Sequence, residues 1–180
     1  MSDLLRNTSK FLSLILRHNP EKIGITLNEN GWADVEELIT RTRRMGRKLD
    51  MALLEKVVAE NDKKRFSFNE SKTMIRANQG HSIKVDVELP PTVPPNTLYH
   101  GTASRFIESI KSKGLVKGKR LHVHLSSNHS TAAAVGKRHG SPVVLEVDSL
   151  AMYNNGHIFY LSENGVWLTE SVPVEYLRFG

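Results

Sequence analysis

Two residues that can carry positive charge, Arg17 and His18, stand side by side at the end of the apolar stretch FLSLILRHNP. Basic side chains near a helix C-terminus complement the helix dipole, which gives the pair a purely structural interpretation. Residues three and four apart share a helix face, so we expect His18 to lie on the apolar stripe of Leu14 and Ile15. A basic pair at the border of a buried face would also suit an anion such as phosphate, and both interpretations stay open.

A second basic candidate is Arg76, at the end of the segment TMIRA and directly before ANQGHS. The second segment offers amide, imidazole and hydroxyl groups and contains no acidic residue. These groups could receive an anion. An ordinary solvated loop is the alternative.

A third set of candidates lies in the segment KGKRLHVHLSS, where Arg120, His122 and His124 are spaced two apart. If this segment is a strand, the three side chains point to the same face. A His-x-His pair on a strand can bind zinc, but a zinc site needs a third protein ligand, and His129 belongs to a different element. We therefore predict no metal site, and a half-buried polar surface is the alternative.

The segment YHGTASRF places His100, Gly101 and Thr102 where an expected strand turns into a helix. Glycine allows a ligand to approach the backbone closely, and a helix N-terminus favours a phosphate group. Many ordinary strand-to-helix turns have the same composition, so this motif is a weak indication by itself.

The elements that must position these residues fall into two parts, because the segment ELPPTVPPN, residues 88–96, contains four prolines and cannot form a helix. We predict domains at residues 1–87 and 97–180, joined by this proline-rich linker. In the first part, Thr8 or Ser9 is expected to cap a helix. Two further helices, the later one capped by Asp50, and a hairpin from RFSF and TMIRA complete a winged-helix pattern.

The second part alternates short strands with short helices. We expect strands at TLYHG, LHVHLSS, PVVLEVD, HIFYL and GVWLT, and helices at ASRFIESIKSKG, ending at Gly114, and at STAAAVGKRHG. The chain as a whole is therefore predicted to be α+β, with a mostly antiparallel sheet in its second part. Neither a dinucleotide-binding glycine motif nor a P-loop is present in the sequence.

Composition narrows the functional classes. The formal charge of +6 favours a polyanionic partner such as nucleic acid, and the absence of cysteine excludes disulfides, thiolate metal ligands and a cysteine nucleophile. No secretory signal or membrane span is evident, so we expect a cytoplasmic protein. The expected third helix carries Glu55, Glu60 and Asp62, which would repel DNA phosphates and disfavour a DNA-reading role.

Seven motifs, LSLILRHNP, GWADVEELI, KKRFSF, IRANQGHS, LYHGTASRF, HVHLS and ENGVWLT, follow one another along most of the chain. Together they resemble the RNA 2′-phosphotransferase family, also called tRNA 2′-phosphotransferases. The resemblance implies a winged-helix lobe that binds RNA and an ADP-ribosyltransferase-like lobe that binds NAD. It also implies a role in tRNA splicing or RNA repair.

The resemblance further implies a reaction in two steps. An internal RNA 2′-phosphate attacks NAD and expels nicotinamide, which leaves a 2′-phospho-ADP-ribosylated RNA. A ribose hydroxyl then attacks the phosphorus and releases 2′-hydroxyl RNA and ADP-ribose 1″,2″-cyclic phosphate. We expect a monomer that acts on a tRNA-like RNA.

Site residues are also implied by the resemblance. The basic catalytic residues would be Arg17, His18, Arg76 and Arg120. The NAD-binding residues would be His100, Gly101, Thr102, His124, Ser126 and Val166, where Val166 stands at a hydrophobic third motif position and Trp167, Glu163 and Glu170 are close alternatives.

Two other functions are compatible with the same motifs. An ADP-ribosyltransferase that modifies a protein or a terminal phosphate of nucleic acid would leave a stable ADP-ribose adduct. A non-catalytic winged-helix protein would bind nucleic acid and be indifferent to NAD. The Arg17–His18 pair favours a phosphorylated acceptor and therefore the phosphotransferase.

Overall fold

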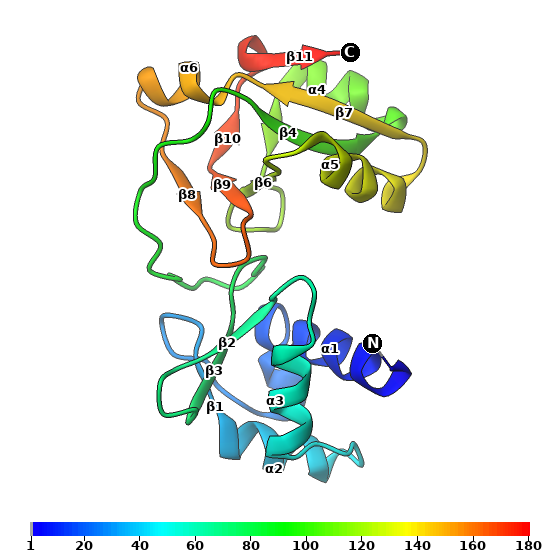
Figure 1. The fold of residues 1–180 in the computed structure, drawn as a ribbon, viewed down its shortest axis with the longest axis vertical. Helices are drawn as coiled ribbons and strands as arrows, with labels where there is room; N and C mark the ends of the chain where they lie inside the picture. The colour runs from blue at the N-terminus through cyan, green and yellow to red at the C-terminus, as the bar shows by residue number, and fades with distance from the viewer. Residues whose placement is uncertain (1) are drawn as a thin grey trace. The chain divides into compact units, whose positions relative to one another are not determined.

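The structure, a computed structural model, describes residues 2–180 (Figure 1). The chain divides into two compact units, which meet in sequence at Glu88 and Leu89. Each unit encloses a hydrophobic core of its own. Helices and antiparallel strands occur in both units, which confirms the predicted α+β class. Among the described residues, no helix is both long enough and apolar enough to cross a membrane.

Unit 1 begins with helix α1, Asp3–Arg17, which starts earlier than predicted. The hydroxyl of Ser2 accepts a hydrogen bond from the backbone N–H of Leu5 and caps the helix. The prediction that Thr8 or Ser9 caps α1 is therefore wrong. Both residues lie inside the helix and are buried, and the Thr8 hydroxyl donates to the carbonyl of Leu4.

The rest of unit 1 follows the predicted order. Helix α2, Val35–Arg44, is capped by Asp34, and helix α3, Met51–Ala59, is capped by Asp50 as predicted. Strands β1, Ala33–Asp34, β2, Phe66–Phe68, and β3, Met74–Ala77, form an antiparallel sheet in the order β1-β3-β2. A short 3-10 helix, Pro20–Ile23, follows α1.

The buried face of α1 is formed by Leu12, Ile15 and Leu16, all of which are fully buried. Leu14 is 36% exposed, and His18 lies on the exposed side. The predicted buried stripe is therefore right for Ile15 and wrong for Leu14 and His18. The half-buried residue of the basic pair is Arg17.

The strands and helices of unit 2 are β4, Leu98–Ala103; α4, Ile107–Lys113; β5, Leu115–Val116; β6, Val123–Leu125; α5, His129–Gly136; β7, Pro142–Val147; α6, Ser149–Asn154; β8, Phe159–Leu161; β9, Trp167–Thr169; β10, Ser171–Val172; and β11, Leu177–Phe179. The strands form three small antiparallel sheets, in the orders β11-β7-β4, β6-β9-β8 and β10-β5. The proline-rich segment contacts the second of these sheets, since the backbone N–H of Thr92 donates to the carbonyl of Phe159.

The predicted strands and helices of unit 2 are present, and α4 stops at Gly114 as expected. Two features differ. Helix α6 and the strands β5, β10 and β11 were not predicted, because a six-residue helix and strands of two or three residues carry too little periodicity to be recognised. Strand β6 begins only at Val123, so Arg120 lies in a turn, and the prediction that it shares a strand face with His122 and His124 is wrong.

Candidate active site

The end of α1 contacts a segment that lies far away in the sequence. The backbone N–H of Ser82 donates to the carbonyl of Arg17 at 3.0 Å, and Nδ1 of His18 lies 2.9 Å from the Ser82 hydroxyl. The Arg17 guanidinium lies against Gly80, since a Cβ built on Gly80 would stand 3.5 Å from Nη1 of Arg17. Gly80 has a φ of +88°, which glycine adopts without strain.

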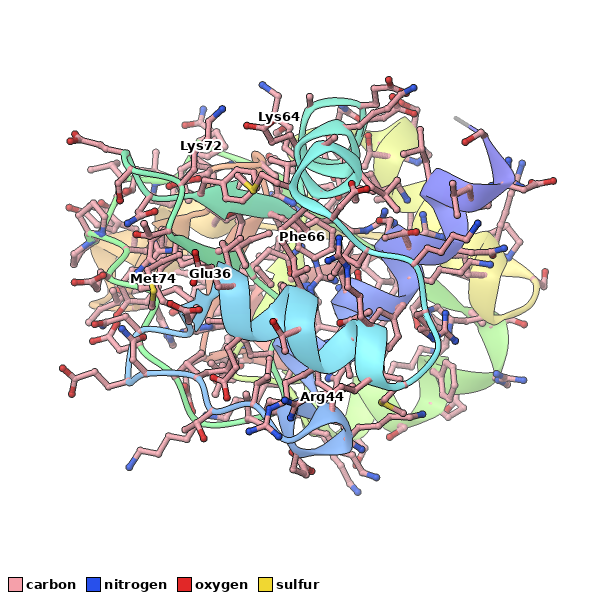
Figure 2. The ribbon with its side chains drawn as sticks, turned by 90° about the horizontal axis from the view of Figure 1, so that it is seen from below. Glu36, Arg44, Lys64, Phe66, Lys72 and Met74 are labelled. Atoms are coloured by element: carbon pink, nitrogen blue, oxygen red, sulfur yellow. The ribbon has the colours of Figure 1, made fainter. Side chains whose placement is uncertain are left out.

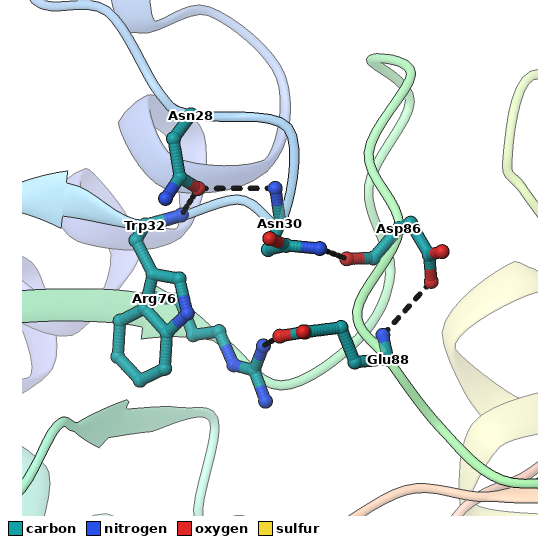
Figure 3. Close-up of polar contacts among 6 residues, drawn as sticks. All are labelled: Asn28, Asn30, Trp32, Arg76, Asp86 and Glu88. Carbon is teal, nitrogen blue, oxygen red and sulfur yellow. Dashed lines mark hydrogen bonds and ion pairs between the residues drawn. The ribbon is translucent and has the colours of Figure 1, made fainter.

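Arg76 reaches the same region from strand β3. Its guanidinium carbon stands 4.5 Å from the centre of the Trp32 ring, and only 11% of its side chain is exposed. The Nε atom of Arg76 is buried and has no hydrogen-bond partner among the described residues. Trp32 is positioned by Asn28, whose side-chain oxygen accepts from the backbone N–H of Trp32 (Figure 3). Packing and stacking therefore orient Arg76 before any ligand binds.

A carboxylate approaches Arg76 from the last residue of unit 1. Nη1 of Arg76 lies 3.4 Å from Oε2 of Glu88 (Figure 3). Glu88 has a φ of 57°, an uncommon conformation for a non-glycine residue. Asp86 accepts a hydrogen bond from the backbone of Glu88, and Asn30 donates to the carbonyl of Asp86, so the segment is held in place.

His81 lies among the three basic side chains and is 1% exposed. Burial, and after it the positive charges of Arg17, His18 and Arg76, together lower its pKa from 6.5 to about 4. His81 is therefore neutral at pH 7. Arg17, His18 and Arg76 around this neutral imidazole form what we call the basic cluster. Sequence reasoning mentioned His81 only as one polar residue of ANQGHS, and no motif spacing marked it.

In unit 2, His100 on β4 contacts the strand that carries His124. Nδ1 of His100 lies 3.1 Å from the carbonyl oxygen of His124. Because a carbonyl only accepts, Nδ1 of His100 carries the proton. Burial lowers the pKa of His100, the hydrogen bond to His124 raises it, and the charges of Arg120 and His139 lower it again, with a net decrease. A neutral His100 with its proton on Nδ1 leaves Nε2 as an acceptor.

His124 has the opposite arrangement. Nη1 of Arg120 lies 3.0 Å from Nδ1 of His124. A guanidinium has only donors, so Nδ1 of His124 accepts and the proton of the ring is on Nε2. Unit 2 therefore presents one imidazole with an Nε2 acceptor and another with an Nε2 donor.

Comparison with known proteins identifies the family. The family described as RNA 2′-phosphotransferase, Tpt1 / KptA family, matches residues 3–171. The chain belongs to this family. Proteins named "Probable RNA 2′-phosphotransferase" are 56% identical in Flavobacterium johnsoniae, over 98% of this chain and 97% of the relative, and 56% identical in Pseudomonas aeruginosa, over 97% and 96%. One in Fusobacterium nucleatum is 53% identical over 94% of this chain and 96% of the relative. The resemblance inferred from the motifs is confirmed.

The remaining residues of the RNA 2′-phosphotransferase motifs lie around β4. Ser126 forms a pair of 2.8 Å backbone hydrogen bonds with Tyr99, which brings it next to the strand. Thr102 is buried. Gly101 lies against α5 so closely that an added Cβ would stand 1.7 Å from the carbonyl oxygen of Ala132. Helix packing alone therefore requires glycine at this position.

The carbonyl of Val166 accepts from the backbone N–H and the hydroxyl of Ser162, the N–H of Val166 donates to the same hydroxyl, and Val166 is half-buried. Its neighbour Trp167 is buried in the core of unit 2. His122, which the sequence grouped with His124, instead has its ring 5.5 Å from that of Tyr160.

A hollow of about 360 Å³ in unit 2 contains none of the predicted site residues and is lined by Asn96, Thr97, Glu146, Val147, Asp148, Leu150, Ala151, Asn154 and Arg178. Within residues 2–180, no three His, Cys, Asp or Glu side chains gather in a way that could hold a metal ion.

Proposed function

We propose that the protein is an NAD-dependent RNA 2′-phosphotransferase, which transfers an internal RNA 2′-phosphate to NAD in two steps. The products would be RNA with a 2′-hydroxyl, nicotinamide and ADP-ribose 1″,2″-cyclic phosphate. The basic cluster of unit 1 is the observation that carries this proposal. Membership of the RNA 2′-phosphotransferase family supports the substrate class.

The basic cluster suits a phosphate monoester. Such a group carries a charge of about −1.5 to −2 at pH 7, so it is a nucleophile without the help of a general base. Arg17 and Arg76 would bind its oxygens through their planar guanidinium groups, which keep their charge at all physiological pH values. His18, whose Nδ1 contacts Ser82, would donate a hydrogen bond or carry a proton. Neutral His81 adds no further positive charge among them.

The residues of unit 2 fit a ribose with two adjacent hydroxyl groups. Nε2 of His100 can accept a hydrogen bond from one hydroxyl, and Nε2 of His124 can donate to another. When bound, NAD would supply two groups. Its ribose carbon would accept the phosphate as nicotinamide leaves, and an adjacent ribose hydroxyl would close the cyclic phosphate. The other residues proposed to bind it are Gly101, Thr102, Ser126 and Val166.

A hydrophobic residue such as Val166 suits this chemistry. The attacking phosphate is already ionised, so no carboxylate is needed at this position to remove a proton. Arg120 is assigned to the second step, in which negative charge increases on the oxygens around phosphorus. Its guanidinium also holds the His124 ring in one tautomer.

The two units are proposed to bind different substrates. We propose that unit 1, with three helices and the sheet β1-β3-β2, is a winged-helix lobe for RNA. Unit 2 would be an ADP-ribosyltransferase-like lobe for NAD. The protein is proposed to act as a cytoplasmic monomer in RNA repair or tRNA splicing.

The proposal is tested with a short RNA that carries one internal 2′-phosphate, incubated with and without NAD. We expect NAD-dependent loss of the phosphate and formation of the cyclic phosphate product. An RNA of the same sequence with a 2′-hydroxyl is the control and should leave NAD unconsumed. An unchanged phosphorylated RNA would refute the proposal, and a stable ADP-ribose adduct would indicate an ADP-ribosyltransferase instead.

A further inference from the structure

Three consecutive basic residues, Lys63, Lys64 and Arg65, connect α3 to β2. We call them the basic turn. Lys63 and Lys64 are exposed, and Arg65 is half-buried. Two acidic residues, Glu60 and Asp62, precede them in the same connection. None of these residues belongs to the basic cluster described above.

The basic turn is fixed on one side by Asn61, which is 3% exposed. The side-chain oxygen of Asn61 accepts from the backbone N–H of Lys63 at 3.1 Å, and its carbonyl accepts from the N–H of Lys64 at 2.8 Å. The side-chain amide of Asn61 donates to the hydroxyl of Ser9 on α1 at 3.0 Å. The turn is therefore tied to the first helix through a buried side chain.

On the other side, the basic turn is joined to the segment that forms the basic cluster. Asn78, which is 4% exposed, donates from its side chain to the carbonyl of Lys64 at 2.6 Å and from its backbone to the carbonyl of Arg65 at 2.9 Å. Asn78 lies between Arg76 and Gly80 in the chain. One buried residue thus ties the turn to the end of β3, two residues after Arg76.

The backbone of Lys64 adopts an unfavourable conformation. Its φ is 40°, in a region where glycine and asparagine are accommodated more easily than lysine. Lys64 lies at the outer edge of unit 1 (Figure 2). Lys72 also has a positive φ, of 55°, but its Nζ pairs with Glu55 at 2.6 Å. Because Lys64 has a strained backbone and an exposed side chain, we infer that its charge has a binding function.

We propose that the basic turn binds the phosphodiester backbone of the RNA next to the nucleotide whose 2′-phosphate occupies the basic cluster. This inference rests on the proposed function, because it takes the cluster as the 2′-phosphate site. Lysine and arginine that neutralise backbone phosphates strengthen binding in a salt-dependent way and carry no sequence information. The turn would thus extend the contact beyond one nucleotide and favour longer RNA over the smallest substrate.

The test compares wild-type protein with Lys64→Asn, which removes the charge and suits the positive φ. Binding is measured without NAD for two RNAs, a dinucleotide with one 2′-phosphate and a longer single strand with the same phosphate at its centre. For the longer RNA, we expect Lys64→Asn to bind about threefold to fivefold more weakly at low salt. The slope of log K against log salt should decrease in magnitude by about 0.7, as for one lost phosphate contact on a single strand. Dinucleotide binding should be unchanged.

The matched control is Lys72→Asn, the same substitution at another positive-φ lysine of unit 1, which should bind both RNAs like the wild type. Thermal unfolding of Lys64→Asn should occur at the wild-type temperature or above, which separates lost binding from misfolding. An unchanged salt slope for Lys64→Asn, or an equal loss on both RNAs, overturns the inference. A wild-type protein that neither binds nor dephosphorylates the dinucleotide refutes the proposed function itself, so the two failures are distinguishable.

Discussion

Arg120 donates a hydrogen bond from Nη1 to Nδ1 of His124 at 3.0 Å and thereby sets the tautomer of that ring. The contact does not come from strand alternation. Arg120 lies in a turn in which its backbone N–H donates to the carbonyl of Lys117, and His124 lies on β6. One side chain therefore has two assigned tasks, to orient a ring of the proposed NAD site and to neutralise charge at phosphorus.

Replacing Arg120 tests these tasks. Arg120→Ala is expected to slow removal of the RNA 2′-phosphate by about 100- to 1000-fold, since a charged donor to the transition state is lost. The second step should slow most, so that RNA heavier by one ADP-ribose accumulates and is detected by mass spectrometry. Lys119→Ala, at the neighbouring exposed basic residue, is the control. Equal rates for the two variants would contradict the assignment.

Glu88 is expected to compete with bound phosphate for Arg76, because its carboxylate lies 3.4 Å from the guanidinium. Glu88→Gln should therefore bind inorganic phosphate about threefold to fivefold more tightly, in line with the modest strength of a partly exposed ion pair. Isothermal titration calorimetry measures this affinity. Glu60→Gln, which removes one acidic charge at the end of α3, should have the wild-type value, and the prediction fails if both variants bind alike.

His81 should make the stability of the protein depend on pH. The folded state keeps its pKa at about 4, while the unfolded chain has the ordinary value of 6.5. Between these values the unfolded state binds more protons, so the free energy of unfolding falls as the pH is lowered from 6.5 to 4. The contribution is fully present above pH 6.5 and amounts to about 3 kcal/mol.

The measurement is urea unfolding of wild type and His81→Gln at several pH values. The decrease in stability between pH 6.5 and 4 should be smaller in the variant by up to about 3 kcal/mol. His100, whose pKa is also lowered, acts in the same direction in both proteins and cancels in the difference. Parallel curves for wild type and His81→Gln would exclude this role.

Gly101→Ala is expected to destabilise the protein by about 3 kcal/mol, because the new Cβ meets a helix backbone and no flexible side chain can move aside. Gly118→Ala is the comparison. Gly118 has a φ of +61°, and a Cβ added there would meet no atom within 4 Å, so only backbone strain of about 1 kcal/mol is expected. Guanidinium unfolding measures both, and equal losses would show that the close contact of β4 and α5 relaxes easily.

Local signals in the sequence predicted much of the fold. Asp50 caps its helix as predicted, because a short side-chain oxygen can reach the free N–H groups of the first turn. Asp34 caps α2 in the same way, although the sequence did not single it out. The same reasoning failed at Thr8 and Ser9, where a better placed cap, Ser2, allows the helix to start earlier. Capping residues are common inside helices too, and packing decides which one ends the helix.

By itself the sequence determined the family, the α+β class, the basic candidates Arg17, His18, Arg76 and Arg120, and the absence of thiol chemistry. These properties depend on residue types and on short-range order along the chain. Tertiary structure alone decided that His81 lies among three basic groups, that Glu88 reaches Arg76, and that Asn78 ties the basic turn to the end of β3. Such contacts join residues distant in sequence, and their energies depend on burial and distance, which no local pattern encodes.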